Sequence, residues 1–232
     1  AGSVWTVLTW VLVCSGIAGP QEIPELKLKT SLERSLSGGQ AHEYRVILAA
    51  GQFLHAVVEQ KGIDVEVVLL GPDGKQIGHM DSLNSAWGPE PMVAIAGVSG
   101  EYRLRVVAGN PQAAAGKYEI HVVALRQATD KDVQHVAANR AVDEAQNLIG
   151  QGNTASLRAA AQKLRNALSF YHADGLRYDE ALSLYTLEVV QAQSGDFHGA
   201  LQSDEQALGL FQGLQDVAME GNTILNVGGA YD

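Results

Sequence analysis

The sequence has few of the residues that carry metal, redox or covalent chemistry. Its 232 residues include one cysteine, Cys14, so no intrachain disulfide can form. The seven histidines never fall at a metal-ligand spacing such as His-x-His or His-Glu-x-x-His. We therefore expect no metal site and no cofactor, and we interpret the histidines as residues of strand faces or helix surfaces.

Catalytic motifs are missing as well. No phosphate loop of the form Gly-x-x-x-x-Gly-Lys-Ser/Thr occurs, and no nucleophile elbow is visible. The adjacent carboxylates Asp179–Glu180 and Asp204–Glu205 would point about 100° apart on a helix. We interpret them as solvated charges and not as an acid–base pair. The expectation is that this chain is not an enzyme and has no catalytic residue.

Basic residues are also scarce. Lysine and arginine total 16 against 26 aspartates and glutamates, a formal net charge of −10. A non-specific nucleic-acid binder needs a basic face that displaces counterions, so nucleic acid is not an expected partner. Apolar residues make up 46% of the chain, which is enough to form a packed core.

A long apolar run is also lacking. The ten-residue run at 4–13 is too short to span a bilayer as a helix, which needs about 20 residues. It has the length of a signal-peptide core and is followed by small residues at 16–18, although the basic segment that should precede it is missing. We interpret 1–19 as a leader of an exported protein, periplasmic or extracellular, and as its only contact with a membrane. The alternative is a buried strand or helix of the first domain. The chain also starts without Met and ends inside a helical pattern, so we interpret it as a piece of a longer product.

Residues 26–125 alternate apolar and polar side chains, the pattern of half-buried strands. The clearest runs are 44–48, 102–106 and 118–122, and they are separated by glycine-rich turn signals such as 71–75. Several short strands with no helical pattern between them predict an antiparallel β-sandwich or barrel. We assign 20–126 to this domain.

The order of short motifs in this region resembles the bacterial pre-peptidase C-terminal domain. The motifs are Tyr44-Arg45-Val46-Ile47-Leu48, Ala50-Gly51-Gln52, Gly71-Pro72-Asp73-Gly74, Ser99-Gly100-Glu101-Tyr102 and Gly116-Lys117-Tyr118. The resemblance implies a jelly-roll-like β-sandwich on an exported bacterial protein. Some members of that family bind calcium or polysaccharide, but no acidic cluster here matches a calcium loop. We interpret Asp64 as a strand-start residue and Asp73 as a turn residue.

From Thr129 onward the apolar period is helical. Thr129-x-x-Asp132 is a plausible cap, and helices are predicted over 129–149, 155–171, 176–193, 196–212 and from 216. Short loops between them predict antiparallel neighbours. We assign 127–232 to a second, all-helical domain, so the fold class is multi-domain, β plus α.

Part of this helical region repeats at an offset of forty residues. Ala167-Leu168 recurs as Ala207-Leu208, since 207 − 167 = 40, and Ala160 recurs as Ala200. Such a period is typical of stacked repeats. The segment resembles the tetratricopeptide repeat, with three departures in which a polar residue takes the place of a small or aromatic one: Glu188, Gln191 and Asp204.

The resemblance implies an α-helical solenoid whose concave face binds a protein or peptide. The residues that would line this face are Leu182, Tyr185, Val189, Asn222, Leu225 and Gly229. Packing against further helices is an equally good interpretation of these residues. The leading functional hypothesis is therefore an exported scaffold for protein–protein interaction.

Two alternatives stay open. The order of leader, sandwich and repeats resembles bacterial CHAT-domain proteins, which implies the sensing arm of a caspase-like peptidase whose catalytic domain is absent from this chain. The second alternative is carbohydrate or surface binding by the sandwich, based on Trp87 in what the sequence predicts to be a polar loop at 81–91.

Overall fold

A computed structural model describes residues 23–29 and 31–229, so the predicted leader and Cys14 lie outside the described residues. In this range the chain forms eight strands followed by five helices. The strands are β1 (Ser31–Leu36), β2 (Ala41–Leu48), β3 (Gln52–Lys61), β4 (Val65–Leu70), β5 (Gln76–Met80), β6 (Trp87–Ile95), β7 (Gly100–Ala108) and β8 (Gly116–Gln127). The helices are α1 (Asp130–Ile149), α2 (Thr154–Asp174), α3 (Arg177–Gln193), α4 (Phe197–Leu214) and α5 (Val217–Gly229).

The strands form two antiparallel sheets that pack face to face. The first sheet has the order β1-β8-β3-β6 and the second has the order β2-β7-β4-β5. Every neighbour in a sheet except β4–β5 comes from a distant part of the sequence, as in a jelly roll built from two Greek keys. The predicted antiparallel β-sandwich is confirmed.

The alternation read from the sequence forms the sandwich core. In β4, Val65, Val67 and Leu69 are fully buried and the residues between them are half-buried. The same period buries Tyr102, Leu104 and the other inward residues of β7. Burial of alternate side chains from both sheets is the main source of the free energy that holds the two layers together.

The helices start and end close to the predicted boundaries. Thr129 caps α1 through a reciprocal pair of bonds with Asp132, as predicted. Asn153 accepts hydrogen bonds from the first amides of α2, and Gly175 ends that helix in the left-handed conformation. Asp196 caps α4.

The residues that repeat at an offset of forty include the small residues through which the helices pack. Ala160, Ala167, Ala200 and Ala207 are all at most 5% exposed. Alanine at such positions lets helix axes approach closely, so close helix packing explains why alanine recurs at these four positions.

The three departures from the repeat pattern are buried polar residues. Glu188 and Gln191 are 8% exposed and Asp204 is 2% exposed. The prediction that Asp204 is a solvated charge is therefore wrong, because α3 packs against α4 on the face of α4 that carries Asp204. The side-chain amide of Gln191 contacts the Ser203 hydroxyl across this helix pair at 2.6 Å.

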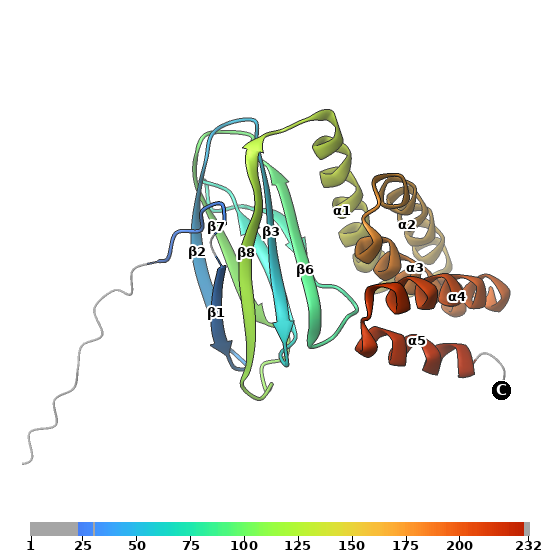
Figure 1. The fold of residues 1–232 in the computed structure, drawn as a ribbon. Helices are drawn as coiled ribbons and strands as arrows, with labels where there is room; N and C mark the ends of the chain where they lie inside the picture. Colours follow the sequence, from blue (N-terminus) through green and yellow to red (C-terminus); the bar gives the residue numbers. More distant parts are fainter. Residues whose placement is uncertain (1–22, 30, 230–232) are drawn as a thin grey trace, which may run out of the picture.

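Figure 1 shows that all five helices lie on one side of the sandwich, beside β6. Helix α1 runs next to β6, and α2 to α5 extend away from it. The contact between sheet and helices therefore depends mainly on α1.

Candidate functional site

Polar contacts hold helix α1 against the side of the sandwich formed by β5 and β6. Asn139 Nδ2 donates to the carbonyl of Pro91 at 3.2 Å, and Tyr171 of α2 donates to Asn139 Oδ1 at 3.0 Å. His79 Nδ1 lies 2.8 Å from Asp143 Oδ1. Because Asn139 and Tyr171 are buried, these bonds are shielded from water and fix the position of α1.

A groove opens where α1 meets the sandwich. Its wider part has a volume of about 790 Å³ and its narrower part about 260 Å³. Ile77, Val93, Val136 and Arg140 line both parts, so the two parts adjoin. We call the two together the edge groove.

The two parts of the edge groove differ in chemistry. The wider part is lined mainly by apolar side chains of both sheets, including Pro72, Ile77, Val93, Ile95 and Val98. The narrower part adds polar side chains, including Gln76, His79, Asn139, Asp143 and Glu144. A ligand that fills both parts must therefore present an apolar portion and a polar one.

Arg140 stands at the junction of the two parts with its charge unmatched. Its neighbours one turn along α1 are already engaged, Asp143 with His79 and Glu144 with Lys163. Over residues 23–29 and 31–229, Arg140 has no ion-pair partner, and its side chain is exposed. A guanidinium in this setting favours a ligand that carries a carboxylate.

The titratable groups beside the groove are shifted by their surroundings. The hydrogen bond with Asp143 raises the pKa of His79 above its usual value. Burial raises the pKa of Asp81 to about 6 and that of Glu90 to about 8. Glu90 is fully buried and accepts from the amide and the hydroxyl of Ser82, so its role is to anchor the loop between β5 and β6.

Within the part of the chain that the structure describes, no three His, Cys, Asp or Glu side chains are placed to hold a metal ion. In the same range no helix combines the length and apolar character that a membrane span requires.

The helical face predicted from the repeat pattern is only partly open. Its residues are Leu182, Tyr185, Val189, Asn222, Leu225 and Gly229, on α3 and α5. Leu182 is 8% exposed and lines a small cavity together with Met80 and Ser82 of the sandwich. Leu182 packs in a cluster with Phe211 of α4 and Met219 of α5, which agrees with the alternative interpretation that these residues pack against further helices.

The other predicted positions differ in exposure. Tyr185, Val189 and Asn222 are half-buried, and Leu225 is 75% exposed. Gly229 is the last residue of α5. A partner on this face stays a prediction.

Two further expectations need correction. Residues 87–91 belong to strand β6, so Trp87 begins a strand instead of lying in a loop; its ring is 55% exposed and borders Gly62. His135, expected on a helix surface, is 7% exposed because α1 packs against β3 at this point.

The edge groove was not predicted from the sequence, although one signal pointed to its location. Pro89 and Pro91 lie in a strand, and proline in a sheet is confined to edge strands and bulges. The proline pair therefore marks β6 as a sheet edge, but nothing local indicates that α1 lies beside it.

No protein-family model matches the chain, and no curated protein matches it. Solved structures give partial likenesses. The pre-peptidase C-terminal domain of a collagenase from Bacillus anthracis is 23% identical, covers 45% of this chain and 97% of that one, and gives a TM-score of 0.36. A periplasmic inhibitor of g-type lysozyme, PliG, from Aeromonas hydrophila is 14% identical over 43% of this chain and 96% of that one, with a TM-score of 0.34. PliG from Salmonella Typhimurium is 18% identical over 43% and 96%, with a TM-score of 0.31. The chain is thus similar in part to small β-rich domains, and this similarity leaves its function open.

Proposed function

We propose that this chain is an exported protein-interaction module that binds a polypeptide partner in the edge groove. The observation that carries the proposal is the groove itself, which is mainly apolar in its wider part and has an unmatched arginine where this part meets the narrower, polar one. Apolar walls with a small number of oriented polar groups are the usual composition of a binding site. A polypeptide supplies both kinds of group from one chain.

The helical region fits the same role. We attribute α3, α4 and α5 to tetratricopeptide-type repeats, supported by the forty-residue register and the buried alanines that repeat in it. In this proposal the helices position α1 as one wall of the groove. A role as the sensing arm of a CHAT-type peptidase is the finer form of the proposal, and the sequence that follows Asp232 in the gene tests it.

A peptide-display selection on the full chain tests the function. Libraries of 12-residue peptides are panned on the immobilised protein, and selected sequences are synthesised and titrated by fluorescence anisotropy. The expected result is a set of peptides rich in apolar residues with at least one carboxylate. Binding should fall by about tenfold or more in Ile77→Asp, because a charge replaces one apolar wall of the groove.

Ile47→Asp is the matched control. Ile47 is also an exposed isoleucine on an edge strand, 51% against 41% for Ile77, but it lies on β2 at the opposite side of the second sheet. Both variants should unfold at similar temperatures, and only Ile77→Asp should lose the peptides. Failure to select any peptide, or equal loss in both variants, rejects the edge groove as the binding site.

A further inference from the structure

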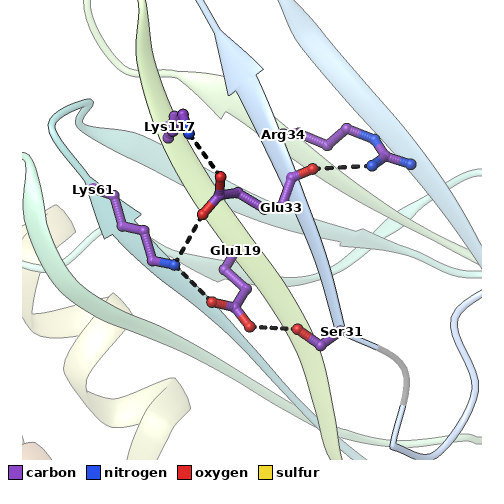
Figure 2. Close-up of polar contacts among 6 residues, drawn as sticks. All are labelled: Ser31, Glu33, Arg34, Lys61, Lys117 and Glu119. Atoms are coloured by element: carbon purple, nitrogen blue, oxygen red, sulfur yellow. Dashed lines mark hydrogen bonds and ion pairs between the residues drawn. The ribbon is translucent and has the colours of Figure 1, made fainter.

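The two sheets have four edge strands. Three of them are blocked, and the fourth, β6, lies beside α1, which binds the Pro91 carbonyl through Asn139, and borders the edge groove beyond that point. Strand β1 lies in a charge network in which Glu33 binds Lys61 and Lys117, and Lys61 also binds Glu119 (Figure 2). Charges of this kind discourage a further strand. Strand β2 is covered at Arg45, whose amide and carbonyl bond to the segment 24–26. Strand β5 has five residues, and its pairing with β4 is interrupted by a bulge.

Strand β6 is the fourth edge, and its register shows which backbone groups face outward. In an antiparallel ladder alternate residues direct their N–H and C=O groups toward the neighbour and away from it. Pro89 and Pro91 have no N–H groups. The Pro89 carbonyl accepts a hydrogen bond from Asn84 and the Pro91 carbonyl accepts one from Asn139, and neither donor belongs to β3. Odd-numbered positions of β6 therefore face away from β3.

The same parity continues into the groove. Ala96 bonds toward β3, since its amide donates to the carbonyl of Gln52. The pairing of β6 with β3 shows no register shift, so Val93 and Ile95 face outward as Pro89 and Pro91 do. Unlike the prolines they carry N–H groups, and both line the wider part of the groove, where Ile95 is half-buried and Val93 is 6% exposed. Within residues 23–29 and 31–229, no strand pairs with β6 on this side.

Building on the proposed function, we infer that the partner binds as an added strand on β6, beside Val93 and Ile95, with a carboxylate on Arg140. The outward N–H and C=O groups of these two residues are unused ladder positions, and strand addition uses such positions. The apolar walls formed by Ile77 and Val98 receive side chains of alternate residues.

The ligand that we infer for the edge groove is an extended, mainly apolar peptide of another protein, with one acidic residue or a free C-terminus. Charge complementarity carries this choice. Arg140 has no carboxylate partner in the described parts of the chain. The three carboxylates that line the groove with it are engaged elsewhere, Asp73 with Lys75, Asp143 with His79 and Glu144 with Lys163. A bidentate guanidinium–carboxylate pair fixes the register of the added strand.

Backbone methylation of a selected peptide tests the inference. Each residue in turn is N-methylated, which removes one N–H donor. An added strand bonds to β6 through alternate residues, so methylation should cost about tenfold in affinity at one parity and less than about twofold at the other. Similar losses at both parities would overturn strand addition.

The carboxylate contact is tested with a second pair of variants. Arg140→Gln should weaken the acidic peptide by about tenfold and leave its neutral amide analogue unchanged. Arg158→Gln, an exposed arginine of α2, is the matched control and should change neither. Equal effects of Arg140→Gln on both peptides would contradict the assignment.

The outcomes separate this inference from the proposed function. Absence of selectable peptides rejects both. Peptides that depend on Ile77 but show no alternation in the methylation scan leave the binding function standing and reject strand addition. Dimerisation of the chain that Ile77→Asp abolishes, measured by sedimentation, would assign the β6 edge to a second copy and overturn the inference.

Discussion

His55 on β3 and His135 on α1 face each other across the joint between sandwich and helices. Their ring centroids lie 5.6 Å apart at an interplanar angle of 80°. Phe53 and Phe170 complete the cluster, with ring centroids 6.2 Å and 5.6 Å from that of His135. Burial and mutual repulsion lower the pKa of His55 to about 4, and burial lowers that of His135 to about 4.

The first prediction is that the free energy of unfolding falls at acid pH, because His55 and His135 are protonated where the sandwich meets the helices. A histidine whose pKa is lower in the folded state favours folding above its ordinary value of 6.5, and this contribution is lost as the pH falls toward 4. Each ring should account for about 2 kcal/mol of lost unfolding free energy between pH 8 and pH 5. Urea unfolding of His135→Phe at both pH values should show a smaller difference than the parent chain.

The charged groups around the pair do not remove the effect. The Asp132 carboxylate favours protonated histidine but is already bound twice by Arg126, at 2.5 and 2.9 Å. His121 opposes protonation of His55. His198→Asn is the control, since His198 is exposed on α4; the same pH response in both variants would contradict the prediction.

The second prediction concerns Asp204, which should make the chain less stable as the pH rises, whereas the histidines make it less stable as the pH falls. Burial, with repulsion from Glu188, raises the pKa of Asp204 to about 7, and its Oδ1 has no hydrogen-bond partner. The unfolded chain ionises first, so this carboxyl makes folding less favourable as the pH rises from about 4 to 7. Asp204→Asn should raise the unfolding free energy at pH 8 by roughly 2–4 kcal/mol and change it little at pH 4.

Glu205→Gln is the control for Asp204→Asn. Glu205 is the adjacent carboxylate on the same helix but is exposed, so its replacement should leave the unfolding free energy within about 0.5 kcal/mol at either pH. A stabilisation at pH 8 that persists unchanged at pH 4 would show that packing, and not ionisation, sets the effect.

The third prediction is that Asn139 is the polar anchor of α1. Asn139→Leu removes the donor to Pro91 and the acceptor for Tyr171, whose hydroxyl is buried. The expected loss of unfolding free energy is about 2–4 kcal/mol, because two buried groups are left without partners. Asn147→Leu, at an exposed site of the same helix, should cost less than about 1 kcal/mol. Equal losses would refute the anchoring role.

The sequence predicted elements far better than their assembly. Strands such as β4 and helices such as α2 follow from local periods and caps, which neighbouring residues determine. The joint does not, because it depends on pairs such as Asn139 with Pro91 and His55 with His135, separated by 48 and 80 residues. The predicted helical face placed Leu182 toward a ligand, since no local pattern shows that Leu182 packs with Phe211 and Met219, which follow it by 29 and 37 residues.

The last prediction concerns the second contact between sandwich and helices, where Gly88 of β6 meets Tyr178 of α3. Gly88 has φ of +98°, and a Cβ there would lie 2.2 Å from the Tyr178 hydroxyl. Gly88→Ala should therefore cost strain from its backbone angle and from this clash, about 3 kcal/mol or more in total. Thermal or urea unfolding measures the loss.

A matched glycine separates these two costs. Gly74 has φ of +76° with nothing within 4 Å of its Cβ position, so Gly74→Ala measures the angle alone, about 1–2 kcal/mol. Tyr178→Phe removes the hydroxyl, which is buried without a partner, and should itself be nearly neutral. In the Tyr178→Phe background the cost of Gly88→Ala should fall toward that of Gly74→Ala. An undiminished cost would mean that the Tyr178 hydroxyl does not limit the approach of α3 to β6, and the second contact would then depend on the remaining side chains of the loop between β5 and β6.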